Sequence, residues 1–403
     1  MLRLVVVALA ALSTTEGDGT TALHWAAYRD DLAAVESLIR SGADVSAAND
    51  LGVTPLWTAC LNGNAAIVRK LLDAGANPNS ALLKGETPLM AAARSGYPQI
   101  VEQLVSKAAN INARGPRGQT ALMWAVAQKH PDVVRVLIDS GADIKARSDV
   151  WSQVMAVPPH GSLEYNRSIP HGGDTALMFA SRVGDLASAK LLVAAGADVN
   201  DQDAWGVSAT VLAAHSGYAE LVEFLLDKGA DPNRAEAGFS ALHIAIMRRD
   251  GRMIRALLAR GADVNAPLRT WTPTRRSSQD LHFQPALVGA TPLWLAARFL
   301  QPEAMRLLVN HGASPLFVHR AEYLAGESFQ KRKEETNLLM AALGKGGGAA
   351  WVQPPKAERE ALTLETVKLT VELGVEVNSA AINAAKVLRY DAVVGFLESV
   401  VHH

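Results

Sequence analysis

The chain has 403 residues, of which 39 are Lys or Arg and 40 are Asp or Glu, so its formal net charge is −1. It therefore lacks the basic excess that is typical of proteins that bind nucleic acid or anionic membranes. Hydrophobic residues make up 49% of the chain and aromatic residues only 5%, a composition too apolar for a disordered protein. The single cysteine, Cys60, excludes an intramolecular disulfide and a multi-cysteine metal site.

Residues 1–20 are interpreted as a leader. The nine apolar residues at positions 4–12 follow Arg3 and precede small polar residues, a pattern typical of a secretory signal peptide. The run is shorter than the roughly 20 apolar residues that span a bilayer. We therefore expect a secreted or periplasmic protein, which N-terminal sequencing of the mature chain would test. If the run is instead a truncated first helix or follows a misplaced start, we expect a cytoplasmic protein.

The rest of the chain is repetitive. A Thr or Ser recurs at spacings of 33, 33, 33, 55, 33, 32 and 51 residues, and an Ala follows it five residues later. These positions are Thr21, Thr54, Thr87, Thr120, Thr175, Ser208, Ser240 and Thr291. Segments such as Thr54-Pro55-Leu56 and Thr291-Pro292-Leu293 resemble the ankyrin repeat, with its T-P-L-H-x-A motif and 33-residue period. The resemblance implies a mainly α fold: a solenoid of stacked helix-turn-helix units with short β-hairpin or finger loops.

The breaks in the period define the predicted organisation. Residues 21–316 are expected to form eight repeats, with insertions at about 148–173 and 266–289. Residues 317–403 are expected to hold a third insertion and two degenerate capping repeats, beginning near Thr336 and Ala380. The Gly346-Gly347-Gly348 run between the helices of the ninth repeat is interpreted as a linker.

Simple backbone chemistry accounts for the repeated positions. A Thr or Ser caps the unpaired N–H groups that begin a helix. Seven of the eight positions found 21 residues after the capping residue are Gly, as expected for a left-handed residue that ends a helix, and the exception is Ala108. Cys60 falls at a small-residue position of an inner helix, so we expect it to be buried and unreactive.

No catalytic motif appears in the sequence, and no cofactor or metal is predicted. His24 and His243 occupy the histidine position of the motif, where the resemblance implies local hydrogen bonds between repeats. An alternative is a zinc site assembled by histidines of the insertions, namely His160, His171, His282 and His319.

The binding surface is predicted from two sets of residues. The first set lies seven and eight residues after the capping Thr or Ser, where the resemblance implies a ligand-facing concave surface: Tyr28, Arg29, Asn62, Arg94, Gln128, Arg182, His215, Arg248, Arg298 and Phe299. The second set lies in the insertions: Tyr165, Arg167, Trp271, Arg275 and Arg276. Five Arg and no acid among the sixteen concave positions suggest a basic groove. Two alternatives stay open: the cations could simply stabilise helix ends, and the loop aromatics could pack back on the solenoid.

We therefore predict a monomeric, non-enzymatic scaffold that binds a protein partner through its concave face and its inserted loops. The partner surface is expected to be acidic, and neither nucleic acid nor integral membrane association is expected. The alternatives are an enzyme or metal-binding protein with a loop-assembled site, and an intracellular regulator without a signal peptide.

Overall fold

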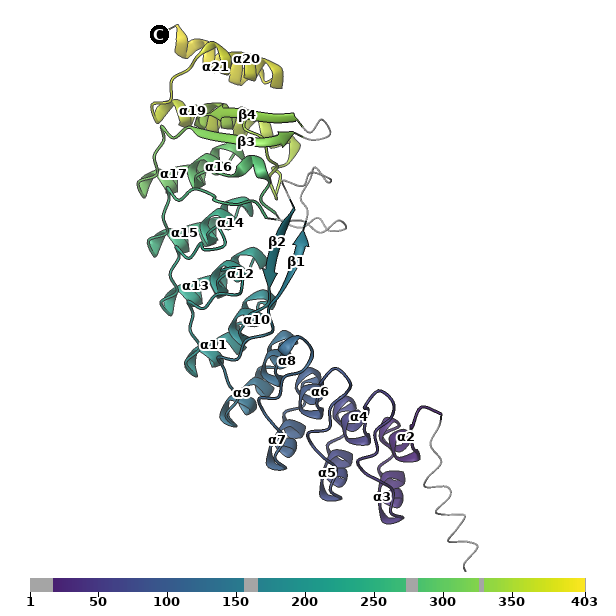
Figure 1. The fold of residues 1–403 in the computed structure, drawn as a ribbon. Helices are drawn as coiled ribbons and strands as arrows, with labels where there is room; N and C mark the ends of the chain where they lie inside the picture. Colours follow the sequence, from purple (N-terminus) through teal and green to yellow (C-terminus); the bar gives the residue numbers. More distant parts are fainter. Residues whose placement is uncertain (1–16, 156–165, 273–281, 326–329, 403) are drawn as a thin grey trace, which may run out of the picture. The chain divides into compact units, whose positions relative to one another are not determined.

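A computed structural model describes residues 17–155, 166–272, 282–325 and 330–402, so the apolar run at positions 4–12 of the predicted leader lies outside the described residues. The chain divides into two compact units, one formed by residues 1–150 and 172–198 and the other by residues 151–171 and 199–403. Each unit is a stack of helix pairs (Figure 1).

In the first unit, the inner helices pack on one another in succession, and so do the outer helices. The inner helices are α2 (Ala22–Tyr28), α4 (Pro55–Asn62), α6 (Pro88–Ser95), α8 (Ala121–Ala127) and α10 (Ala176–Val183). The outer helices are α3 (Leu32–Arg40), α5 (Ala65–Asp73), α7 (Pro98–Ser106), α9 (Pro131–Asp139) and α11 (Leu186–Ala194). Apolar side chains between the two rows form the core; Ile67, Val68 and Leu71, for example, are fully buried.

The second unit repeats this arrangement and adds two hairpins. Its inner helices are α12 (Ala209–Ser216), α14 (Ala241–Met247), α16 (Pro292–Arg298), α18 (Leu338–Ala342) and α20 (Ser379–Leu388). Its outer helices are α13 (Ala219–Asp227), α15 (Gly251–Ala259), α17 (Pro302–Asn310), α19 (Arg359–Glu372) and α21 (Asp391–Val401). The hairpins are β1 (Trp151–Met155) with β2 (Arg167–His171), and β3 (His319–Ala325) with β4 (Gln330–Thr336), both antiparallel.

The predicted helix caps are present in seven of the eight repeats. The side-chain oxygen of the capping residue accepts a hydrogen bond from the third helical N–H, as in Thr54 with Trp57 and Ser208 with Val211. Thr175, at the start of α10, makes no such bond. The capping residues therefore set where the inner helices begin.

The residue 21 positions after the capping Thr or Ser has a positive φ in every one of the eight repeats, from 62° at Ala108 to 98° at Gly196. The left-handed conformation predicted for Ala108 is therefore confirmed. A side chain at such a position costs roughly 1 to 2 kcal/mol.

We expect Ala108→Gly to raise the free energy of unfolding by up to about 1 kcal/mol, because relief of the backbone strain exceeds the extra entropy of the unfolded chain. The reciprocal variant Gly75→Ala should lower it by about the same amount, since Gly75 has a φ of 95° and open space where its side chain would lie. Urea denaturation checks both, and a lower midpoint for Ala108→Gly would contradict the prediction.

Asparagine side chains link consecutive repeats and keep their register. In the second unit, Asn233 accepts a hydrogen bond from the Asp263 amide (2.7 Å) and donates one to the Gly261 carbonyl (3.0 Å). Asn265 makes the same two bonds with Ser314 and Gly312, although the intervening insertion adds residues 266–289. The insertion therefore does not change the hydrogen bonds that join these two repeats.

The C-terminal repeats correct two predicted boundaries. Thr336 ends strand β4, and Asn337 caps α18. Asn378, two residues before the predicted start, caps α20. The sequence reasoning missed both because Asn replaces the Thr or Ser of the earlier repeats.

The prediction that Gly346-Gly347-Gly348 is a linker is wrong. All three glycines have a positive φ, and they lie against Trp294, Ala286 and Leu287, where side chains would collide with the core. Tight packing, rather than flexibility, explains the glycine run.

Candidate functional site

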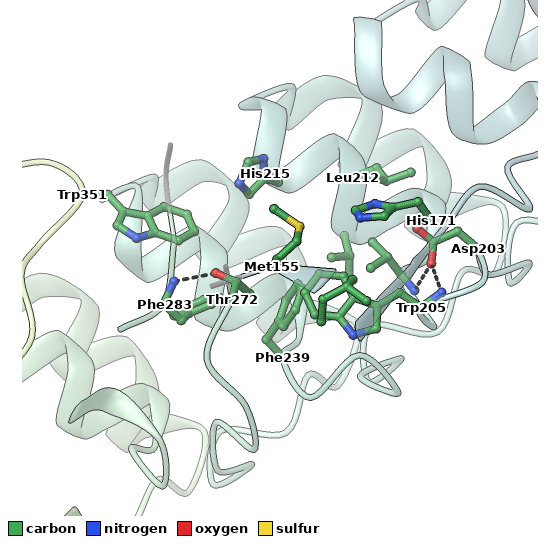
Figure 2. A pocket seen from close by; sticks show the side chains of 13 residues that line it. Met155, His171, Asp203, Trp205, Leu212, His215, Phe239, Thr272, Phe283 and Trp351 are labelled. Carbon is green, nitrogen blue, oxygen red and sulfur yellow. Dashed lines mark hydrogen bonds between the residues drawn. The ribbon is translucent and has the colours of Figure 1, made fainter. Parts of the chain in front are cut away.

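An apolar pocket of about 260 Å³ lies within the second unit (Figure 2). Three segments that depart from the repeat pattern contribute to its wall: the β1/β2 hairpin, the insertion 266–289, and the segment between α18 and α19. The regular repeats supply the rest, including Val211, Leu212 and His215 of α12. Residues that interrupt the repeat at distant points of the sequence thus line one cavity.

A continuous row of aromatic rings forms one side of the pocket. Trp205 lies edge-on to Phe239 (5.7 Å between ring centroids), and Phe239 contacts Phe283 (5.5 Å). Phe283 contacts Trp351 (5.1 Å), which in turn lies edge-on to His215 (5.7 Å). Such tilted and edge-to-face pairs stabilise the arrangement beyond simple burial. The row joins four segments of the chain into one wall.

The β1/β2 hairpin supplies further lining residues. Met155, Ile169 and His171 line the pocket. They lie on one face of the hairpin because His171 is directly opposite Trp151, Ile169 opposite Gln153, and Met155 opposite Arg167. The rings of His171 and Trp151 are stacked at 5.6 Å. The hairpin thus presents apolar and aromatic groups to the pocket.

Hydrogen bonds hold the irregular segments in place. The backbones of Thr272 and Phe283 are joined by a 3.0 Å bond, and the Phe283 amide also donates to Thr272 Oγ1 (2.8 Å) (Figure 2). The Trp351 indole donates to the His282 carbonyl (2.7 Å). Arg298 donates to the carbonyls of Gly347 and Gly348 (3.1 and 3.0 Å), and burial lowers its pKa. Arg298 therefore anchors the segment that carries Trp351.

The lining favours an uncharged ligand. Among the described residues, no Lys or Arg lines the pocket, and the one carboxylate, Asp203, accepts hydrogen bonds through Oδ1 from the amides of Trp205 (2.9 Å) and Val207 (2.8 Å) (Figure 2). An anionic ligand would find no counter-charge among these lining residues. The chemistry of the pocket suits an apolar, preferably aromatic, group.

The predicted arginines of the first unit are engaged within the chain. Arg94 forms an ion pair with Glu86 (3.0 Å), and Arg182 forms one with Asp174 (2.7 Å). Each acid directly precedes a capping Thr, eight residues before its arginine, and sequence reasoning missed this regular spacing. Arg29 lies 5.6 Å from the Trp25 ring.

The other predicted residues of this unit are polar and lie toward solvent. Tyr28 is 62% exposed, and Asn62 donates to the Tyr28 carbonyl (3.0 Å). Gln128 lies at the end of α8 and is exposed.

Two predicted aromatic contact residues are buried, which corrects the sequence interpretation. Trp271 is 5% exposed and Phe299 is 4% exposed. Trp271 lies beneath Arg167, whose guanidinium is 4.6 Å from the ring and donates to Thr270 (3.1 Å). The alternative in which loop aromatics pack back on the repeats therefore holds for Trp271. Of the predicted residues of the second unit, His215 lines the pocket.

The arginines of the second unit also make contacts within the chain. Arg248 donates to the His215 carbonyl (2.9 Å), and the half-buried Arg298 donates to the carbonyls of the glycine segment. Tyr165, Arg275 and Arg276 lie outside the described residues. The acidic partner surface inferred from the arginine row stays a prediction.

The two motif histidines have the predicted local role. His24 Nε2 is 2.9 Å from the Val53 carbonyl, and His243 Nε2 is 3.0 Å from the Ala266 carbonyl. Cys60 is fully buried, as predicted, and burial raises its pKa.

The part of the chain that the structure describes holds no cluster of three metal-ligating side chains. His319 is instead buried, 4.2 Å from the Trp294 ring and bonded to the Val288 carbonyl (3.0 Å). His160 lies outside the described residues.

Sequence reasoning missed most of the aromatic row. It did not select Trp205, Phe239 or Trp351, and for the loop aromatics, which include Phe283, it left open whether they are exposed or pack back on the solenoid. A signal was available in Phe239, which directly precedes the capping residue Ser240, a position where apolar side chains pack against a helix start. For Trp351, no local pattern indicates the partner that it contacts.

Among the described residues, no helix is both long enough and apolar enough to cross a membrane. The family models for ankyrin repeats match residues 2–81, 78–148 and 177–267 in one form, 122–193 in a second form, and 288–320 as a single repeat.

Several known proteins are similar over part of the chain. A mitochondrial disaggregase from Bos taurus is 34% identical over 167 residues, which cover 41% of this chain and 22% of the relative. A putative ankyrin repeat-containing protein from Treponema pallidum is 39% identical over 93 residues, which cover 23% of this chain and 31% of the relative. The chain thus spans less than a third of either relative.

Among solved structures, the human ASB11 ankyrin repeat domain is 26% identical, with a TM-score of 0.49 over 60% of this chain and 99% of that domain. The capped helix pairs, the left-handed residue that ends each outer helix and the matches of the repeat models agree with one another. The chain belongs to the ankyrin-repeat proteins, whose repeats form protein-protein interaction domains.

Proposed function

We propose that this chain is a non-enzymatic protein-binding module whose second unit anchors a partner by an apolar side chain inserted into the aromatic pocket. The observation that supports this most directly is the convergence of three irregular segments on a single pocket. Insertions in repeat proteins often form the binding face. Here the insertions supply a cavity with defined walls as well as additional exposed surface.

The size of the pocket fits one side chain. An engineered apolar cavity of about 150 Å³ binds benzene, and this pocket has about 260 Å³. One aromatic side chain, including a two-ring indole, is therefore compatible with the space. Burial of a large apolar side chain contributes roughly 1.5 to 3 kcal/mol, which is the scale of a contact that dominates an interface.

The test places a charge in the pocket without disturbing the core. Leu212 lines the pocket and is half-buried, so Leu212→Glu adds a carboxylate that an apolar ligand must desolvate. Leu61→Glu makes the same change at a half-buried position of an inner helix in the first unit. Proteins retained from an extract of the native source are compared for the wild type and the two variants, and the partner is then purified.

We expect Leu212→Glu to lower the affinity for the purified partner by about 30-fold or more, which corresponds to about 2 kcal/mol of binding free energy. Leu61→Glu should leave this affinity nearly unchanged. Titration calorimetry measures both. Equal affinity for the wild type and Leu212→Glu, or a loss confined to Leu61→Glu, would place the binding surface elsewhere.

A further inference from the structure

The two outer edges of the β1/β2 hairpin differ in their capacity to pair with another strand. Ser152 lies opposite Pro170, and Val154 lies opposite Ser168. Proline has no N–H, so Ser152 and Pro170 cannot be a pair that is joined by two hydrogen bonds. Hydrogen-bonded and non-hydrogen-bonded pairs alternate along an antiparallel ladder, so Val154 and Ser168, two residues away, are also a non-hydrogen-bonded pair. The N–H and C=O groups of these residues therefore point away from the partner strand.

The outer edge of β1 keeps its hydrogen-bonding groups, whereas that of β2 is blunted. β1 offers the amides and carbonyls of Ser152 and Val154, while Pro170 removes a donor from the β2 edge. Within the described part of the chain, no hydrogen bond to the outward groups of Ser152 or Val154 is observed. An edge of this kind is a template for another strand.

The side chains of β1 also lack the features that usually protect an edge. No residue of β1 is charged, Val154 is 69% exposed, and Trp151 is 38% exposed. The other hairpin provides an internal comparison, because ion pairs cross it at Arg320–Glu335 (3.0 Å) and Lys333–Glu322 (3.3 Å). Charged side chains are a common protection against strand addition. The same molecule therefore protects one hairpin and leaves β1 open.

β1 also belongs to the pocket. Met155, its last residue, lines the cavity, and the residues of β2 that share its face, Ile169 and His171, do so too. A strand added to β1 would continue this face, and every second side chain of that strand would lie on it. Backbone pairing would supply affinity, and the pocket would select the side chain.

We propose that an extended, uncharged segment of the partner protein adds to the outer edge of β1 as a third strand and directs an aromatic side chain toward the pocket. The inference rests on the proposed function and specifies the conformation of the partner. An extended segment is favoured because the outward peptide groups of Ser152 and Val154 recur at the two-residue spacing of a strand. An uncharged segment is favoured because, in the part of the chain that the structure describes, neither β1 nor the lining of the pocket includes a Lys or Arg.

The experiment uses a fluorescein-labelled synthetic peptide with alternating Thr and Val residues and one central Trp, and the full-length chain. Val154→Pro removes the outward amide of β1, and Ser168→Pro removes the outward amide of β2 on the same rung of the ladder. Both residues are exposed, so the two variants are a matched pair. We expect Val154→Pro to weaken peptide binding by about fivefold or more, as one lost hydrogen bond implies, and Ser168→Pro to leave it unchanged.

A second arm needs no altered protein. In an added strand, every second amide of the peptide would face β1. N-methylation of these amides should abolish binding, whereas N-methylation of the remaining amides, which face away from β1, should not. Hydrogen exchange followed by NMR should show slower exchange of the Ser152 and Val154 amides in the complex, by about tenfold or more.

Three outcomes overturn the inference. The first is no binding and no change in exchange at millimolar peptide. The second is equal affinity of both proline variants for the peptide. If Leu212→Glu still lowers the affinity for the purified partner, the proposed function stands without strand addition. The third is a self-association of the free chain that Val154→Pro abolishes, which would make a second copy the occupant of the edge.

Discussion

Replacement of Phe283 by alanine is expected to lower the free energy of unfolding of the second unit by about 3 to 5 kcal/mol. Phe283 is 1% exposed, and its ring lies between those of Phe239 (5.5 Å) and Trp351 (5.1 Å), with His243 at 6.4 Å. Removal of the ring leaves a cavity at the centre of the aromatic row. The neighbouring side chains cannot collapse fully into it because three separate segments hold them.

Phe224→Ala is the matched control. Phe224 lies on outer helix α13 and is half-buried, with Lys228 Nζ 6.0 Å from the centre of its ring. Phe224→Ala should therefore lower the free energy of unfolding clearly less than Phe283→Ala does. Urea denaturation gives the two free energies, and hydrogen exchange with mass spectrometry shows whether residues 203–216 lose protection only in Phe283→Ala. An equal or smaller cost for Phe283→Ala would mean that residues 282–289 do not form part of the core.

The repeats themselves were predictable because their determinants are local. A capping Thr, a short amphipathic pattern and a helix-ending Gly lie within about 21 residues of one another, and each acts through hydrogen bonds to its own backbone. The same argument predicted the strained Ala108. Where the local residue changed, as from Thr to Asn at Asn337 and Asn378, the predicted boundaries shifted.

The pocket was not predictable in the same way. The spacing located the insertions but could not show which aromatic residues would be buried, because burial depends on residues far away in the sequence. Trp271 contacts Arg167, about a hundred residues earlier, and Trp351 contacts His282, 69 residues earlier. The charge count had a different limit. It did not include Glu86 and Asp174, which form ion pairs with Arg94 and Arg182.

Acidification is expected to destabilise the second unit through His243. The imidazole is 1% exposed, and its Nδ1 accepts a hydrogen bond from the Ser240 amide (3.2 Å), so the proton of the neutral ring lies on Nε2 and is donated to the Ala266 carbonyl (3.0 Å). Protonation of Nδ1 would break the first bond and charge a buried ring. Burial accordingly lowers the pKa of His243 to about 4.

The sign of the effect follows from the two pKa values. The unfolded chain, with a histidine pKa of about 6.5, binds the proton at a higher pH than the folded chain does. The contribution of His243 to the free energy of unfolding is therefore complete above about pH 6.5. It falls as the pH is lowered toward 4, by as much as about 3 kcal/mol. His319 should add to the loss in the second unit, and His24 should make the first unit sensitive to acid, because burial lowers the pKa of each.

The variant His243→Met isolates this contribution. Methionine stands at the equivalent position of three other repeats, at Met90, Met123 and Met178, and is buried in each, so the site should accept it. At pH 7 we expect His243→Met to be somewhat less stable than the wild type, because the Ser240 amide loses its acceptor. Between pH 7 and 4.5, the free energy of unfolding should fall less in His243→Met than in the wild type. His311→Met, at an exposed histidine of the same unit, controls for the substitution itself. If urea denaturation gives parallel pH profiles for the wild type and His243→Met, the buried imidazole is not what makes this unit sensitive to acid.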